Sequence, residues 1–372
     1  MKAVTSEGRS SVARKDPVLD WLLEPDNPPV RYLTLTQLMG KPATDPEVRR
    51  AGERRMDYAV TQEILRRWSE YAEDDDRAYW KYTGKYWQLI FLGKFLADGQ
   101  HPRIAQLAEN ILATRKWINP SGGQCLTANL LAALDSLGYG EHPVVKQERE
   151  ALAGRINSAA GIQCHVMDYS LLPRCYMAQP KLLLCFARVA PRERSPALRS
   201  AIKLLAGNLV ENQVFMYVPG NRKQWQAILQ RQPKSADLPK GRTVKQWVAG
   251  QRERFMAQRG LGEGEPKAVW LKFGFPLHYN SDLLEAVYAL AQAGVAYSSR
   301  LEKPLQAIAF KQTPDGKWIL ENSLNGKMLA DVEVQGQPSK WLTYFARCVL
   351  KWLGVSEGRP EGVPGVGRRK AL

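Results

Sequence analysis

The chain has 372 residues, 44% of them hydrophobic, which is enough to bury the core of a globular protein. Its net charge of +16 favours anionic partners, although a generally basic surface gives the same value. No run approaches 18 apolar residues, which argues against a transmembrane helix, and the charged N-terminus has no apolar signal segment. Five cysteines without the spacing of a disulfide framework suit a reducing compartment, so we expect a cytoplasmic protein.

The two ends of the chain differ in composition from the part between them. Residues 1–15 are polar and basic, and residues 356–372 are rich in Gly, Pro and Arg, so we predict a disordered tail at each end. Residues 16–355 are predicted to form a single domain of helices, each ten to fifteen residues long and bounded by Gly, Pro, Asp or Ser. Alternating strand patterns are nearly absent, so the expected fold class is all-α.

A recurring pair of helices organises this domain. An apolar helix ends near a Gly, a short link with Pro follows, and a more polar helix begins; the His-Pro links at 101–102 and 142–143 are 41 residues apart. A sixth inner helix at 339–354 finds its outer partner in residues 16–23 if the two ends of the chain pack together. Neither terminal helix is polar enough to cap an open solenoid, so the pattern predicts a closed ring.

Residues 209–270 interrupt this repeat as a basic insertion. From Arg222 to Lys267 the chain has eleven Lys or Arg residues and four Asp or Glu residues, with Trp225 and Trp247 among them. Basic residues mixed with aromatic residues suit nucleic acid or an anionic surface. A solvated insertion without any partner gives the same charge pattern, so the sequence leaves both interpretations open.

The stretch FKQTPDGKW places Gln312, Gly316 and Trp318 in a Gln-spacer-Gly-x-Trp pattern, and Trp117 lies in a partial copy of it. Together with the helical pairs, this pattern resembles the terpenoid cyclase and protein prenyltransferase superfamily, and most of all its uncharacterised prokaryotic squalene-cyclase-like members. The similar segments span about residues 27–353. The resemblance implies an (α/α)6 toroid, which is a barrel of about six inner and six outer helices around a central cavity.

Several of the similar segments begin inner helices. In a ring, these helices run parallel, so their N-terminal residues are expected to meet at one mouth of the cavity, beside the positive ends of the helix dipoles. The resemblance implies an isoprenoid, a lipid or another apolar and anionic ligand there. Core packing explains aromatic residues at helix starts equally well, and surface snorkelling explains the lysines. The predicted ligand-binding residues are Trp80, Tyr82, Lys85, Tyr86, Trp87, Tyr176, Tyr279, Lys340 and Trp341.

A zinc site is the sharpest chemical hypothesis for the same mouth. Protein prenyltransferases of this superfamily hold catalytic zinc with one Asp, one Cys and one His at a comparable rim, and the resemblance implies a similar set here. The chain has no CxxC pair, and cysteines that act as small buried hydrophobes are the alternative. The predicted metal ligands are Cys125, Cys164, His165, Cys175, His278 and Asp282.

Two functions from different classes therefore remain. The first is a pocket for an apolar and anionic ligand, assisted by zinc if the thiols bind it; an enzyme of this kind would be a transferase or cyclase acting on an isoprenoid-type substrate. The second is a non-catalytic binding or scaffold protein that holds a protein or an anionic partner. The acidic run Asp74, Asp75 and Asp76 lies in a polar link, where water keeps the carboxylates ionised and unsuited to start a cyclisation.

Overall fold

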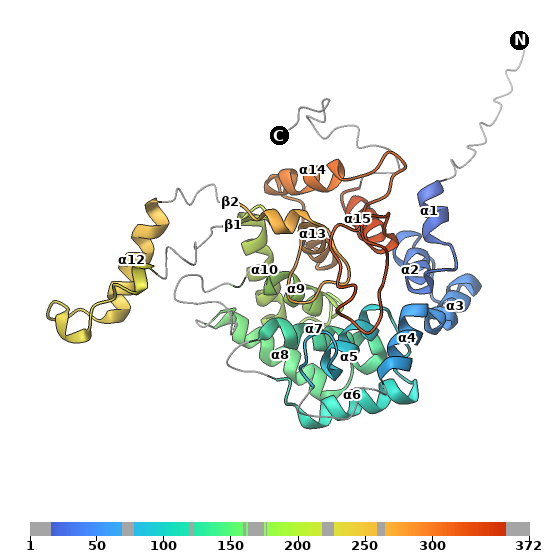
Figure 1. Cartoon of the computed structure of the whole chain (residues 1–372), viewed down its shortest axis with the longest axis horizontal. Helices are drawn as coiled ribbons and strands as arrows, with labels where there is room; N and C mark the ends of the chain where they lie inside the picture. Colours follow the sequence, from blue (N-terminus) through green and yellow to red (C-terminus); the bar gives the residue numbers. More distant parts are fainter. Residues whose placement is uncertain are drawn as a thin grey trace, which may run out of the picture.

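The computed structural model describes residues 16–68, 78–118, 123–158, 161–162, 175, 177–217, 227–258 and 265–354. The predicted tails and the three aspartates at 74–76 lie outside these residues. Helices dominate the described chain and, apart from α12, gather into one body (Figure 1). Their bounds are α1 Pro17–Leu22, α2 Pro28–Leu33, α3 Pro46–Glu53, α4 Ala59–Trp68, α5 Lys85–Lys94, α6 Pro102–Thr114, α7 Gln124–Leu134, α8 Pro143–Asn157, α9 Ala178–Ala187, α10 Pro196–Glu211, α12 Val244–Gln258, α13 Leu283–Gln292, α14 Glu302–Phe310 and α15 Lys340–Trp352.

The expected all-α class is confirmed for the part of the chain that the structure describes. The only sheet there is one antiparallel pair of two-residue strands, β1 (Met216–Tyr217) and β2 (Glu265–Pro266). None of the described helices is both long enough and apolar enough to cross a membrane.

The helices fall into two kinds according to how much of their surface is buried. In α5 every residue from Lys85 to Gly93 is buried, because the helix is apolar on nearly all sides and has neighbours all round it. In α6 only one face is buried, along Ile104, Leu107 and Ile111. The fully covered helices pack in sequence order: α5 against α7, α7 against α9, α9 against α13, and α13 against α15.

The predicted Pro-containing links between helices are confirmed at the two His-Pro pairs. Helices α6 and α8 begin with Pro102 and Pro143, each preceded by a histidine at the N-cap position. The His142 Nδ1 atom accepts a hydrogen bond from the backbone N–H of Val144 at 3.2 Å. Proline suits this position because it sets φ for the helix and the first N–H of a helix needs no partner within it.

The two tryptophans of the repeated Gln-Gly-Trp pattern occupy equivalent places. Both are buried, and each indole N–H donates to a carbonyl in the last turn of the preceding helix, α6 or α14: Trp117 to Ile111 at 2.7 Å, and Trp318 to Ile308 at 2.9 Å. The backbone of each tryptophan is also hydrogen-bonded to a threonine of the following apolar helix, α7 or α15. The pattern therefore marks where one helix pair is tied to the next.

The two ends of the described chain lie together, as the sequence predicted. Arg347 in α15 forms a salt bridge with Asp16, the N-cap residue of α1. The Tyr344 hydroxyl donates to the side chain of Gln37 at 2.6 Å, and the Lys351 ammonium donates to the Gln37 carbonyl at 2.7 Å. Helix α15 therefore packs beside the N-terminal segment.

Helices α5 and α7 approach each other most closely at Gly93. A Cβ atom placed on this residue would lie 2.6 Å from the Ala133 Cα, which is backbone and cannot swing aside. We expect Gly93→Ala to lower the free energy of unfolding by about 1–3 kcal/mol, because the two helices must move apart. Gly154→Ala in α8 meets open space and should raise the free energy of unfolding by about 0.5–1 kcal/mol. Urea denaturation of both variants tests this, and equal stabilities would contradict it.

Candidate functional site

Several of the predicted residues meet around His278, where the N-terminal ends of α5 and α13 come together. The Tyr82 hydroxyl is hydrogen-bonded to His278 Nε2, and the two rings pack edge to face with centroids 4.4 Å apart. The rings of Trp87 and Tyr279 lie 5.6 and 5.3 Å from the imidazole. Asn129 of α7 donates to the His278 carbonyl at 3.0 Å. We name the four rings of Tyr82, Trp87, His278 and Tyr279 the aromatic cluster.

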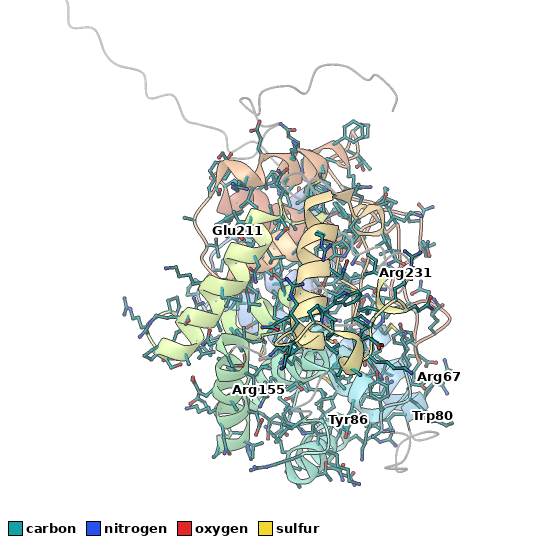
Figure 2. All side chains as sticks on the ribbon, turned by 90° about the vertical axis from the view of Figure 1, so that its left-hand side faces the viewer. Arg67, Trp80, Tyr86, Arg155, Glu211 and Arg231 are labelled. Carbon is teal, nitrogen blue, oxygen red and sulfur yellow. The ribbon has the colours of Figure 1, made fainter. Side chains whose placement is uncertain are left out.

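The aromatic cluster is buried at His278 and reaches the surface at its rim. His278 is 4% exposed, whereas Tyr79 and Trp80 in the link before α5 are about half exposed (Trp80 is labelled in Figure 2). The Tyr79 and Tyr279 hydroxyls are hydrogen-bonded to each other. The Lys81 ammonium lies 5.9 Å from the centre of the Tyr279 ring, within the range of a cation–π contact. The aromatic side chains therefore extend from the surface to the buried histidine.

The imidazole and the phenol at the centre of the cluster are both neutral at physiological pH. Burial, together with the positive charges of Lys181 and Lys81, lowers the pKa of His278 to about 3. Burial raises the pKa of Tyr82 to about 12. His278 Nδ1 is buried and has no hydrogen-bond partner among the residues that the structure describes. Since such atoms are normally paired, Nδ1 can hold a polar atom of a ligand.

Asp282, predicted as a metal ligand, has a structural role as the N-cap residue of α13. One carboxylate oxygen accepts from the Glu285 N–H at 2.7 Å, and the other accepts from the Gly274 N–H at 2.8 Å. Burial and the nearby charge of Glu285 raise the pKa of Asp282 to about 7. Both oxygens therefore serve to fix the loop from Gly274 onto the start of α13.

Three charged residues on apolar helices were not predicted from the sequence to lie at the site: Lys94 on α5, Lys181 on α9 and Glu285 on α13. The Lys181 side chain is fully buried and forms an ion pair with Glu285. Burial, and then the positive charge of Lys181, lower the pKa of Lys94 to about 8. Among these three residues there are thus two cations and one carboxylate, and the ion pair joins Lys181 to Glu285. One or two charged residues within an otherwise apolar helix were the signal that could have identified them.

The two predicted lysines have partners within the chain. The Lys85 ammonium donates to the side-chain oxygen of Asn110 in α6 at 2.9 Å. The Lys340 ammonium forms salt bridges with Glu24, at 2.8 Å, and with Asp26. Both lysines are buried. Their observed role is to hold neighbouring segments together.

The remaining predicted ligand-binding residues lie in different surroundings. Tyr86 is buried in the core. Trp341 stacks on Phe275, with ring centroids 4.3 Å apart and an interplanar angle of 20°. Tyr176 lies outside the described residues. Of the predicted set, the structure brings Tyr82, Trp87 and Tyr279 together around His278.

The predicted zinc ligands do not assemble in the part of the chain that can be described. No group of three His, Cys, Asp or Glu residues in that part lies close enough to hold a metal ion. Cys125 and Cys175 are buried and form no disulfide, and the oxygens of Asp282 are taken by backbone N–H groups. Cys164 and His165 lie outside the described residues. Zinc binding therefore stays a prediction.

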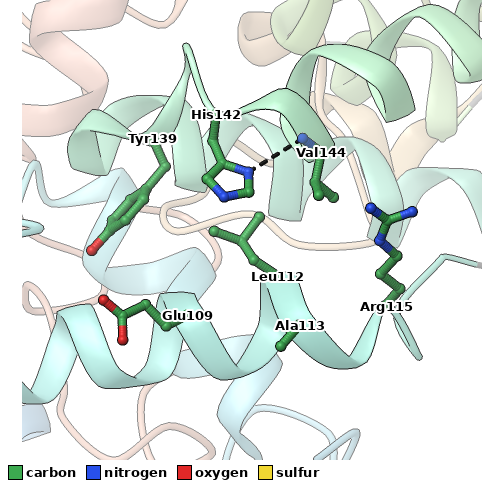
Figure 3. Close-up of a pocket in the computed structure, with 7 residues that line it drawn as sticks. All are labelled: Glu109, Leu112, Ala113, Arg115, Tyr139, His142 and Val144. Atoms are coloured by element: carbon green, nitrogen blue, oxygen red, sulfur yellow. Dashed lines mark hydrogen bonds between the residues drawn. The ribbon is translucent and has the colours of Figure 1, made fainter.

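A separate pocket of about 460 Å³ lies on the surface between α6 and the start of α8 (Figure 3). Its lining includes Glu109, Leu112 and Arg115 from the α6 side, and Tyr139 and His142 from the link before α8. The Tyr139 hydroxyl is hydrogen-bonded to a backbone carbonyl, that of Gly99, at 3.0 Å. None of the predicted ligand-binding residues lines this pocket.

Comparison with known proteins gives no match: no family model, no curated protein and no solved structure matches the chain. A functional proposal for the chain therefore rests on the aromatic cluster and on the charges beside it.

Proposed function

We propose that the chain is an α/α toroid of the terpenoid cyclase type whose interior binds a ligand with an apolar chain and an anionic head, such as an isoprenoid or lipid phosphate. The ring is supported by the sequence-order packing of α5, α7, α9, α13 and α15. It is also supported by a second chain of contacts. Helix α15 contacts α2, α2 contacts a short 3₁₀ turn at Arg54–Asp57, that turn contacts α4, and α4 contacts α5.

The observation that carries the ligand proposal is an excess of positive charge beside aromatic rings. Lys94 and Lys181 both lower the pKa of His278, so their charges act at the aromatic cluster. Only Glu285 is ion-paired with either of them among the described residues. An unbalanced cation in a poorly solvated place is costly unless an anion approaches it. A phosphate head supplies that anion, and the rings supply an apolar surface for the chain.

The described groups suit binding better than proton transfer. A general acid or base works best with a pKa near the working pH, whereas His278 and Tyr82 titrate near 3 and 12. Burial raises the pKa of Asp282 to about 7, but its oxygens accept hydrogen bonds from backbone N–H groups. We therefore propose a binding pocket first; a transferase or cyclase activity, with or without zinc, would need groups beyond these three.

Calorimetric titration with farnesyl diphosphate, farnesol and inorganic diphosphate tests the proposal. We expect Lys94→Met to weaken farnesyl diphosphate binding by about ten- to a hundredfold, because a charge-assisted hydrogen bond is worth about 1.5–3 kcal/mol. Farnesol carries no charge, so its affinity should not change. Lys203→Met, which removes an exposed lysine of α10, is the matched control. Absence of farnesyl diphosphate binding to the unaltered protein, or equal binding by Lys94→Met, would refute the proposal.

A further inference from the structure

The insertion predicted from the sequence leaves the helical body and returns to it at one place. Strands β1 and β2 pair antiparallel, with Met216 opposite Pro266 and Tyr217 opposite Glu265. The Lys267 N–H donates to the Phe215 carbonyl at 2.9 Å and extends this pairing by one bond. We name the described residues between the strands, 227–258, the basic excursion. Figure 1 shows its helix α12 standing apart from the other helices.

The basic excursion carries a concentrated positive charge. Its sequence has seven Lys or Arg residues and two Asp or Glu residues, hence 7 − 2 = +5 within 32 positions, against +16 for all 372. Six of the seven basic side chains are described as exposed: Arg231, Lys234, Lys240, Arg242, Lys245 and Arg254. Arg231 is labelled in Figure 2, which looks onto this side of the molecule.

These six side chains have no acidic partner in the part of the chain that can be described. None of them forms a salt bridge with another described residue. Like charges at this density repel one another and destabilise the segment that carries them. A bound polyanion offsets that repulsion. The counterions that leave the polyanion on binding make the complex more favourable.

The apolar side of α12 is already covered in part, which favours a polyanion over a membrane as the partner. Val244, Trp247 and Val248 lie at i, i+3 and i+4 on one face and are half-buried. Ile228 and Leu229, elsewhere in the excursion, are also half-buried. A helix that inserts into a bilayer must present such a face to lipid. Charge is therefore what the excursion presents to a partner.

We propose that the basic excursion binds the phosphodiester backbone of nucleic acid without reading its sequence. The spread of the charges over separate turns and a helix suits a row of phosphates, and arginine forms bidentate pairs with phosphate groups. This site is distinct from the interior of the body and does not depend on the ligand proposed for it. Phosphate contacts of this kind make the affinity fall steeply as salt rises.

The test is fluorescence anisotropy of the full-length protein with a labelled DNA duplex of about 30 base pairs and, separately, with single-stranded RNA of the same length, at several salt concentrations. The test variant combines four substitutions in the basic excursion: Lys240→Gln, Arg242→Gln, Lys245→Gln and Arg254→Gln. The control variant neutralises four exposed residues of the body: Arg49→Gln, Arg192→Gln, Lys203→Gln and Lys303→Gln.

We expect the unaltered protein and the control variant to bind with similar salt dependence. The excursion variant should bind duplex DNA about tenfold or more weakly at low salt, with the slope of log affinity against log salt reduced by about 3 to 4, since each phosphate contact contributes about 0.9. The two probes show whether DNA or RNA is preferred. Equal slopes for the two variants overturn the proposal. So does binding to phosphatidylserine vesicles without binding to either nucleic acid, which would assign the excursion to a membrane surface.

Discussion

Replacement of Lys181 by methionine is expected to lower the free energy of unfolding by about 3–5 kcal/mol. The Lys181 side chain is fully buried, and its ammonium is ion-paired with Glu285, whose side chain is only 11% exposed. Methionine is similar in length and keeps the packing of α9, but it leaves the Glu285 carboxylate in a poorly solvated place without its cation. Urea denaturation at neutral pH measures the loss.

The double variant Lys181→Met, Glu285→Leu is the control for this prediction. It removes both charges and keeps apolar volume on α9 and α13, so we expect it to recover most of the lost stability. A single variant Lys181→Met that lies within about 1 kcal/mol of the unaltered protein would show that water reaches Glu285 and solvates it. The pair would then contribute no more than a surface salt bridge.

Asp282 and His278 are expected to give opposite dependences of stability on pH. Asp282 has its pKa raised from 3.8 to about 7, so between these values the folded chain holds a proton that the unfolded chain releases, and stability falls as pH rises. His278 has its pKa lowered from 6.5 to about 3, so between these values the unfolded chain binds the extra proton, and stability rises with pH. From about pH 4 to 6.5 the two slopes, each at most about 1.4 kcal/mol per pH unit, oppose each other.

Variants at the two positions should separate these slopes. Asp282→Asn removes the contribution to stability that falls as pH rises. We therefore expect the stability of this variant to rise with pH more steeply than that of the unaltered protein between about pH 4 and 6.5. His278→Phe keeps a ring among the aromatic residues and removes the rising contribution, so its stability should fall with pH over the same interval. Urea denaturation at three pH values within this range suffices. Profiles parallel to that of the unaltered protein in both variants would contradict the assigned protonation states.

The helical pairs could be predicted from the sequence because their signals are local. Pro102 and Pro143 begin α6 and α8, and α5 is apolar on nearly all sides. The start of a helix and its degree of burial can therefore be predicted from a few neighbouring residues. The repeat left the helix at 339–354 without a partner and offered residues 16–23 for that place, and the salt bridge between Asp16 and Arg347 lies between these two segments.

The candidate site could be predicted only in part, because its contacts join distant residues. Helix starts placed Tyr82 and His278 at the same mouth, but their hydrogen bond spans 196 positions and depends on the left-handed backbone of Tyr82, at a φ of 70°. The position of a residue on a helix also does not determine where a long side chain points. Lys85 and Lys340 stand at helix starts as expected, yet hydrogen bonds and opposite charges within the chain determine where their ammonium groups lie.

The contact between α15 and the N-terminal segment has a consequence for biosynthesis. Arg347 and Asp16 are 331 positions apart, so helix α15 is made long after α1. During translation α1 and α2 leave the ribosome long before the helix against which they pack exists. The apolar surface that α15 covers therefore stays open until α15 itself has been made, and only then can this contact form.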